Sequence, residues 1–364
     1  MDFGETTTRY REKIDNALQA YFAKKHKEIT VKDALAEENF FAMQNYVSGK
    51  GKRLRSICTI AAYFACGGKE EEKILLPSLS VEFLHNASLI LDDMMDEDRE
   101  RRGFLSAHST LEEWFDANIG KTPYTGYLFS NARSRFAVSM SIIAADMLLS
   151  LGEQTIIESK FSGEEKINAI GIYEKTYRQL NLGQMLDVYY EYKPQVSEQN
   201  YLNMAYLKTG VLIGGSLKLG AALAGASEAQ LKALEEFALH AATCFQIQDD
   251  ILDVTPGAEK GRPLGSDIRK GKNTILVIEA KKVLAEKEWK KVEHALGNEK
   301  IGEKELNEIM QLFREKKIIS NAQAMAEESI AKGKAALRKA KPAFNKEWLS
   351  FLDAFADYLL HRSK

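Results

Sequence analysis

The sequence predicts an all-α fold, and three observations lead to this prediction. Only 6 prolines occur among the 364 residues, and alternating runs of β-branched residues, which would indicate strands, are scarce. Apolar residues instead recur at helical spacing, as at Leu54, Ile57, Cys58 and Ala61. The hydrophobic content of 45% is enough to bury a large core. We therefore expect one domain over residues 1–364, built as a helical bundle.

The expected helices follow one another along most of the chain. A helical repeat over 54–66 ends at a glycine pair, which favours a helix C-terminus. Continuous apolar character over 78–93 and 235–253 indicates buried central helices, and both run into carboxylates. Further helices are expected over 140–156, 177–192 and 212–226, with amphipathic outer helices over 306–317 and 329–340. The Gly-, Pro- and Lys-rich stretch 255–274 is expected to be a loop, whereas 112–135 fits neither pattern.

Composition and charge exclude several classes of protein. Lysine and arginine number 50 against 52 acidic residues, a net charge of −2, so no global field attracts nucleic acid. Three cysteines (Cys58, Cys66 and Cys244) in apolar surroundings are expected to be reduced core thiols. The N-terminus lacks the pattern of a signal peptide, and no uncharged apolar stretch reaches about 18 residues. We expect a cytoplasmic protein without a transmembrane span or a nucleic-acid partner.

Two acidic triads of the form D-D-x-x-D end the two most apolar helices. The first consists of Asp92, Asp93 and Asp96, and the second of Asp249, Asp250 and Asp253. On a helix the first and third members lie four apart on one face, where like charges repel. Most charge runs are simply a solvated face. Here that explanation is weak, because a solvated face is least expected at the end of a buried helix, and the triads therefore predict a ligand site.

The chemistry of that ligand follows from the donor atoms. Carboxylate oxygens select hard cations such as Mg²⁺, Mn²⁺ or Ca²⁺, and the loop pattern of an EF-hand is absent. Mg²⁺ takes few carboxylates and keeps positions for water and substrate phosphates. Two triads that face each other across a cleft would thus bind Mg²⁺ and, through it, a polyphosphate.

Basic residues near the triads support a phosphate ligand. Arg101 and Arg102 follow the first triad, and the others are Lys52, Arg55, Lys208, Arg262 and Lys272. Arginine offers a bidentate fork and lysine a compact charge for phosphate, although no P-loop motif is present. Any one of these could equally be an ordinary surface charge. Their association with the triads gives them weight.

With these motifs in view, the chain resembles the trans-polyprenyl diphosphate synthases. The resemblance rests on "GKRLR", "EFLHNASLILDDMMDEDRERRG", "GQMLD", "LKTG", "FQIQDDILD" and "GSDIRKGKNT", which occur in the family's order over roughly residues 49–274. It implies a bundle of about ten or more helices around a deep central cavity, usually a homodimer. It also implies Mg²⁺-dependent head-to-tail (1′–4) condensation of isopentenyl diphosphate with an allylic diphosphate.

The resemblance implies a role for each matching residue. The implied Mg²⁺ ligands are Asp92, Asp93, Asp96, Asp249 and Asp253; Asp250 lies beside them, and these six with Lys208 form the expected catalytic set. The implied allylic diphosphate ligands are Arg101, Lys208, Thr209, Gln246, Arg262 and Lys272. The implied isopentenyl diphosphate ligands are Lys52, Arg55, His85 and Arg102. About three Mg²⁺ ions are implied per active site, with Mn²⁺ as a substitute.

The length of the product is expected to depend on the apolar helix before the first triad. Ala87 and Ser88, one turn before Asp92, are small, and Leu84 lies a further turn back. In this family a bulky aromatic residue there stops the product at farnesyl, whereas small residues let it grow. The motifs are most similar to those of geranylgeranyl diphosphate synthases. We expect a C20 product from a dimethylallyl, geranyl or farnesyl primer, with C15 and C25 or longer as alternatives.

Three departures from the family pattern stand out. Arg262 replaces a usual lysine, and Phe104 and Leu105 follow Gly103 where Pro-Thr or a similar pair is usual. Residues 109–140 contain about thirty more residues than the family pattern allows, which indicates an insertion. One hypothesis is that this insertion caps the cleft.

The same residues argue against three rival functions. A class I terpene cyclase also uses D-D-x-x-D, but usually replaces the second triad with an Asn/Ser/Glu pattern. A non-catalytic regulatory subunit of a prenyl synthase tends to lose aspartates, and all six are present here. A plain helical scaffold with acidic surface is weaker still.

Overall fold

The computed structural model describes residues 2–28, 33–49, 51–101, 103–193, 196–257 and 263–361. In these ranges the chain is almost wholly helical, which confirms the predicted all-α class. The N-terminal half comprises α1 (Phe3–His26), α2 (Ala34–Ser48), α3 (Leu54–Ala65), α4 (Glu71–Ser78), α5 (Ser80–Met95), α6 (Ala107–Asn118), α7 (Ala132–Ile157) and α8 (Gly163–Glu191). The C-terminal half comprises α9 (Glu198–Ala205), the π-helix η1 (Tyr206–Gly210), α10 (Val211–Leu223), α11 (Glu228–Asp253), α12 (Ser266–Arg269), α13 (Ile275–Val283), α14 (Glu286–Ala295), α15 (Glu303–Glu315), α16 (Ile318–Lys339) and α17 (Lys346–Leu360).

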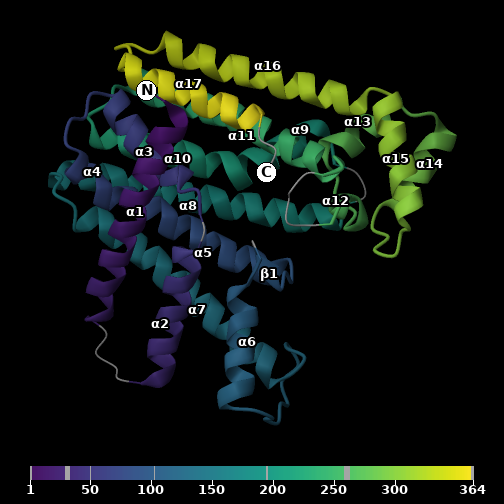
Figure 1. The fold of residues 1–364 in the computed structure, drawn as a ribbon, viewed down its shortest axis with the longest axis horizontal. Coiled ribbons are helices and arrows are strands. Elements are labelled where there is room, and N and C mark those ends of the chain that lie inside the picture. The colour runs from purple at the N-terminus through teal and green to yellow at the C-terminus, as the bar shows by residue number, and fades with distance from the viewer. Residues whose placement is uncertain are drawn as a thin grey trace.

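Helix α10 forms the centre of the bundle and packs against α3, α8 and α11 (Figure 1). Nearly all of its side chains are buried. Two glycines allow the close packing: a Cβ at Gly220 would lie 1.9 Å from the Thr59 carbonyl oxygen of α3, and one at Gly215 would lie 2.2 Å from Thr176 Oγ1 of α8. The glycine-rich stretch 212–226, predicted as a helix, is therefore the axis around which the others pack.

The C-terminal helices cover this core from one side. Helices α16 and α17 run along α11 at one edge of the molecule (Figure 1), and their buried residues recur at helical spacing, as expected for amphipathic outer helices. The predicted loop 255–274 is irregular where it is described, except for the single turn of α12.

The segment that the sequence left unassigned is a helical hairpin. Helix α6 ends at Asn118, and α7 begins after a capping box. In this box the side chain of Asn131 and that of Ser134 each accept a hydrogen bond from the other residue's backbone N–H. Helix α7 packs on α5 and α6, and the hairpin projects away from α11–α13 (Figure 1).

A left-handed residue ends α5 and reverses the chain. Glu97 has φ 53°, and the chain then forms a short hairpin of β1 (Glu100–Arg101) paired with β2 (Phe104–Leu105). Gly103, with φ 78°, lies in its turn. Arg101 is therefore carried on a strand that folds back toward the end of α5.

Two helical stretches are long and apolar enough to cross a membrane by length and composition alone, although the sequence predicted none. Glu71–Met95 is 72% buried inside the molecule and Ala132–Ile157 is 33% buried. The first is a core segment, whereas α7 exposes much of its apolar surface.

Candidate active site

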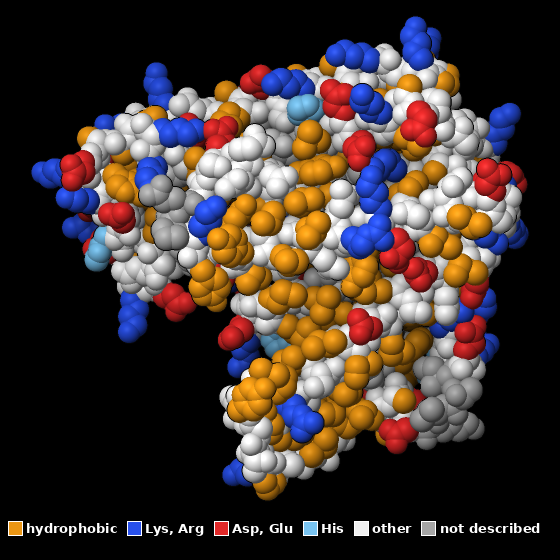
Figure 2. Space-filling model, turned by 180° about the vertical axis from the view of Figure 1, so that it is seen from behind, with side chains coloured by type: hydrophobic (Ala, Val, Ile, Leu, Met, Phe, Trp, Pro, Cys, Tyr) orange, Lys and Arg blue, Asp and Glu red, His pale blue; other side chains and the backbone are white. Residues whose placement is uncertain are grey.

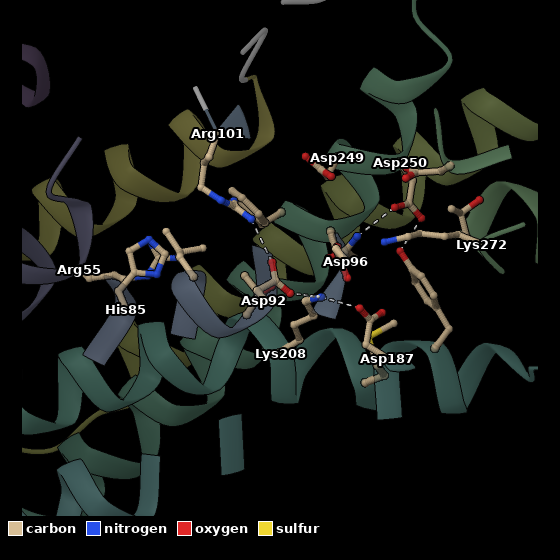
Figure 3. A pocket seen from close by; sticks show the side chains of 18 of the residues that line it. Arg55, His85, Asp92, Asp96, Arg101, Asp187, Lys208, Asp249, Asp250 and Lys272 are labelled. Atoms are coloured by element: carbon tan, nitrogen blue, oxygen red, sulfur yellow. Dashed lines mark hydrogen bonds and ion pairs between the residues drawn. The ribbon is translucent and has the colours of Figure 1, made fainter. Parts of the chain in front are cut away.

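A cavity of about 620 Å³ lies among the helices that carry the predicted motifs. Its walls come from the segment before α3, from α5 and β1, from α8 and η1, from α11, from residues 267–274 and from α17. The deep central cavity that the resemblance implied is thus present. Figure 3 shows the carboxylates and cations that line it.

The members of the first triad lie in two places, the cavity wall and the buried interior. Asp92 and Asp96 are half-buried and line the cavity. Asp93 is fully buried and is not part of the cavity wall; its carboxylate accepts hydrogen bonds from Tyr46 at 2.7 Å and from Arg101 Nε at 2.5 Å. Arg101 also donates to Asp92 at 3.1 Å. Burial would lower the pKa of Arg101, but Asp93 and then Asp92 raise it, so the guanidinium stays charged.

Lys208 lies at the centre of the site, between two carboxylates. Its Nζ is 2.5 Å from Asp187 Oδ2 and 3.1 Å from Asp92 Oδ1 (Figure 3). Burial would lower the pKa of Lys208, but the charges of Asp92 and Asp187 raise it well above its usual range. The same pairing lowers the pKa of Asp92 against the effect of its burial. Burial and the charge of Asp92 raise the pKa of Asp96.

The π-helix η1 and a close helix approach place Lys208 there. A Cβ at Gly183 on α8 would lie 2.5 Å from the Lys208 backbone nitrogen, so only glycine lets η1 approach α8 this closely. Asp187, four residues later in the same "GQMLD" motif, then meets the lysine side chain. Single π turns inside helices often occur at functional sites.

The second triad faces the first across the cavity (Figure 3). Asp249 and Asp250 line it. The Asp250 carboxylate accepts from Tyr201 at 2.6 Å, from the Ile275 backbone at 2.9 Å and from Gln246 at 3.0 Å. Burial, and next the charge of Asp267, raises the pKa of Asp250 to about 7.

Asp253 is buried and lies outside the cavity wall. It accepts from the Asp267 backbone nitrogen at 3.1 Å. That contact ties the end of α11 to the segment that carries Lys272. Thr209, Gln246 and Lys272, expected on the allylic diphosphate, all line the cavity.

Lys52, Arg55 and His85 line another part of the cavity, and Figure 3 shows Arg55 and His85 side by side. Lys52 donates to Tyr358 of α17 at 2.7 Å. Arg53, which follows Lys52, is buried and has a left-handed backbone conformation (φ 52°).

Arg53 anchors this basic segment to two helices. Its guanidinium donates to Asp15 of α1 at 2.7 Å and lies 3.4 Å from Glu82 of α5, which also accepts from the Ser56 backbone at the start of α3. Arg53 thereby fixes the backbone of the segment that carries Lys52 and Arg55.

Several predicted residues lie elsewhere. Leu84 and Ala87 are fully buried, Ser88 is half-buried and donates to the His85 carbonyl, and none of the three is part of the cavity wall. Their role in product length stays a prediction. Arg102 and Arg262 lie outside the described residues.

The inserted segment and the acids after the first triad can now be placed. Among the described residues of the cavity wall, none comes from 109–140, which gives no support to the capping hypothesis. Asp98, just after the first triad, pairs with Lys270 at 3.3 Å and links the two motif-bearing segments.

Sequence reasoning missed Asp187 and Asp267, although both belong to quoted motifs, and it missed Tyr46, Tyr201 and Tyr358. The carboxylates within "GQMLD" and "GSDIRKGKNT" were a usable signal. The tyrosines gave none, because they come from α2, α9 and α17, far from the triads in sequence.

The donor set fits Mg²⁺ shared with a diphosphate. The carboxylates of Asp92, Asp96 and Asp249 line the cavity, and Asp92 Oδ1 already pairs with a cation there, the Lys208 ammonium at 3.1 Å. Within the described ranges, no three Asp, Glu, His or Cys side chains converge closely enough to hold a metal by themselves. Such a site suits an ion that takes few carboxylates and completes its shell with phosphate oxygens and water.

Comparisons with known proteins point the same way. Residues 38–313 match the family described as Polyprenyl synthetase. The chain is 32% identical to a short chain isoprenyl diphosphate synthase of Methanocaldococcus jannaschii over 83% of this chain and 81% of that protein. It is 29% identical to a geranylgeranyl pyrophosphate synthase of Geoglobus acetivorans, with 91% and 93% covered.

The fold also matches a solved structure. A geranylgeranyl pyrophosphate synthase of Corynebacterium glutamicum, crystallised with isoprenyl diphosphate and magnesium, superposes with a TM-score of 0.86 at 24% identity, and both chains are covered completely. This likeness concerns the fold.

Proposed function

The chain belongs to the polyprenyl synthetase family and is a prenyltransferase that elongates isoprenyl diphosphates, and on this premise we propose that its product is geranylgeranyl diphosphate. The observation that carries the proposal is the cavity itself, where Asp92 and Asp96 face Asp249 and Lys208 pairs with Asp92. This is a site for a diphosphate held through Mg²⁺.

The proposed metal ligands are the cavity-lining aspartates of both triads, Asp92, Asp96 and Asp249. Mg²⁺ supplies charge stabilisation for the departing diphosphate. Binding of about three ions per site, and replacement by Mn²⁺, are part of the proposal. Asp93 and Asp253 stay predictions as ligands, since the described contacts engage their carboxylates elsewhere.

The chain's own cations are proposed to hold the two substrates apart. Arg101, Lys208 and Lys272 bind the allylic diphosphate, with Thr209 and Gln246 beside them, and Lys52, Arg55 and His85 bind isopentenyl diphosphate. The raised pKa of Lys208 keeps the ammonium charged as the allylic C1–O bond breaks. C4 of isopentenyl diphosphate attacks C1, and the proton lost from C2 goes to the departing diphosphate.

The proposed C20 product rests on the small side chains at Ala87 and Ser88 and on the name of the Geoglobus relative. Farnesyl (C15) and C25 or longer products are the alternatives. Dimethylallyl, geranyl and farnesyl diphosphates are all proposed as primers.

We further propose a homodimer in the cytoplasm. Figure 2 shows a broad band of apolar side chains on one face, and α7 and α8 expose large apolar residues that include Ile142, Ile143, Met147, Leu182 and Met185. Exposed apolar area of this kind is typical of subunit interfaces. The three cysteines are free thiols, in keeping with a reducing compartment.

One assay tests the product and the metal together. The protein is incubated with labelled isopentenyl diphosphate and each primer, after EDTA treatment and addition of Mg²⁺ or Mn²⁺, and the products are dephosphorylated and separated. We expect geranylgeraniol as the longest product, and none without metal. A longest product of C15 or C25 would replace the C20 assignment. Sedimentation equilibrium at micromolar concentration would contradict the dimer if it gave the mass of a single chain.

A further inference from the structure

The two acidic triads share a second feature besides their spacing: the middle aspartate of each is held by a tyrosine hydroxyl. Tyr46 donates to Asp93 at 2.7 Å, and Tyr201 donates to Asp250 at 2.6 Å. The two tyrosines come from α2 and α9, which carry none of the predicted motifs. Asp93 is 0% and Asp250 2% exposed.

The same two aspartates also hold the side chains expected on the allylic diphosphate. The second oxygen of Asp93 accepts from Arg101 Nε at 2.5 Å, and the second oxygen of Asp250 accepts from Gln246 at 3.0 Å. Each middle aspartate therefore connects a tyrosine from outside the motif to a cavity-lining side chain. The relation is repeated on both sides of the cavity.

We propose that Asp93 and Asp250 are positioning residues and not metal ligands, and that Tyr46 and Tyr201 fix them so that Arg101 and Gln246 point at the allylic diphosphate. The inference rests on the proposed function, because it assumes a diphosphate between the triads.

The hydrogen bonds of the Asp93 and Asp250 carboxylates support positioning roles for these two residues. Both oxygens of Asp93 and both oxygens of Asp250 accept hydrogen bonds, Asp250 also from the Ile275 backbone. A cation bound to either would compete with these buried donors for the same oxygens. By contrast, the Asp92 side chain is 15% exposed, lines the cavity and points its Oδ1 at the Lys208 ammonium.

At the first triad, the charged contacts of Arg101 also support the assignment of Asp93 as a positioning residue. Arg101 is a rigid fork whose orientation decides whether it can bind a diphosphate in two places. With Nε on Asp93 and Nη2 on Asp92, the guanidinium plane is set by two carboxylates of one helix. Loss of the Tyr46 hydroxyl would let Asp93 rotate, and Arg101 would follow.

The experiment compares Tyr46→Phe, Tyr201→Phe and Asp93→Asn with Asp92→Asn. Mn²⁺ binding in the presence of inorganic diphosphate is measured by electron paramagnetic resonance, and the Michaelis constants of both substrates are measured by turnover. Tyr173→Phe is the matched control, because Tyr173 is as buried as Tyr201 and its hydroxyl donates to the Leu149 carbonyl, outside the cavity wall.

We expect Asp92→Asn to weaken Mn²⁺ binding about tenfold or more, while the two tyrosine variants and Asp93→Asn leave it within about twofold. The tyrosine variants should raise the Michaelis constant of the allylic diphosphate about fivefold and leave that of isopentenyl diphosphate unchanged. Tyr173→Phe should change neither constant.

Equal weakening of Mn²⁺ binding by Asp93→Asn and Asp92→Asn would overturn the inference, and so would tyrosine variants that behave like Tyr173→Phe. Failure of the proposed function looks different: Asp92→Asn would then leave Mn²⁺ binding intact. In that case the allylic Michaelis constant of Tyr46→Phe still decides whether the tyrosine positions the site.

Discussion

Asp187 Oδ2 accepts a hydrogen bond from the Lys208 ammonium at 2.5 Å, and the two residues come from α8 and η1. This pair holds the lysine at the centre of the cavity while its other side faces Asp92. On the proposed assignment of Lys208 to the allylic diphosphate, Asp187 is a residue that would act on the substrate through Lys208.

Replacement of Asp187 by asparagine should therefore reduce turnover without unfolding the protein. The lysine loses a charged partner, so we expect kcat/KM for the allylic diphosphate to fall about tenfold. Glu235→Gln is the control, because it breaks another ion pair between a lysine and a carboxylate. That pair, Lys218–Glu235 at 2.6 Å, lies outside the cavity wall. Equal losses in the two variants would mean that Asp187 matters only for stability.

The buried Arg53–Glu82 pair predicts a stability effect. Both side chains are 4% exposed, so removal of Arg53 leaves the Glu82 carboxylate buried without this ion pair, whereas removal of Glu82 leaves Arg53 with Asp15. Arg53→Ala should lower the free energy of unfolding by about 3 kcal/mol, measured by urea denaturation. The double variant Arg53→Ala/Glu82→Ala should be less destabilised than the sum of the two single variants. Additive losses would show that the two residues do not interact energetically.

Product length should respond differently at two adjacent positions. Ser88 is half-buried one turn before Asp92, whereas Ala87 is 0% exposed. We expect Ser88→Phe to shorten the longest product to C15 in the labelled assay. Ala87→Phe should instead overpack the core and cost about 1–3 kcal/mol of stability. A folded, fully stable Ala87→Phe enzyme that makes C15 would reverse the two assignments.

A carboxyl pair between α7 and α8 predicts a pH dependence of stability. A hydrogen bond to Glu174, and next burial, raises the pKa of Glu153 to about 7. The folded protein therefore binds a proton there that the unfolded chain has released above its ordinary pKa near 4.5. The stabilisation is complete below that value and is lost as the pH rises through about 7.

Glu153→Gln should consequently gain in melting temperature relative to the unaltered protein between pH 5 and pH 8. Glu165→Gln, on α8, should show the opposite dependence at lower pH, gaining in melting temperature relative to the unaltered protein as the pH falls below about 4.5. The backbone hydrogen bond from Ser162 lowers the pKa of Glu165, so its stabilisation exists above the ordinary value and is lost as the pH falls. Parallel trends in the two variants would contradict both assignments.

Helical periodicity predicted the fold and the triads because both depend on local spacing. The four-residue spacing of Asp92 and Asp96 does bring both to the cavity. Helical spacing does not extend to Asp98 and Arg101, because a left-handed Glu97 ends the helix without a glycine to signal the turn.

The contacts that complete the site could not be read from spacing. Lys208 follows Asp187 by 21 positions and reaches it through a π turn, a rare geometry. Tyr46 and Tyr201 reach the triads only through tertiary packing. The family resemblance identified which segments meet, whereas only the structure identifies which atoms meet.

Helix α5 also fixes the distance between two groups in the cavity wall. It carries His85, proposed to bind isopentenyl diphosphate, and, seven positions later, Asp92, a proposed metal ligand at the allylic diphosphate. At ~1.5 Å per residue the helix sets these two groups ~10 Å apart along its axis. A single inserted residue between them would turn one group by ~100° relative to the other. On the proposed assignment of the two substrates, the register of this helix would set the spacing of the two diphosphates and therefore whether the two reacting carbons can meet.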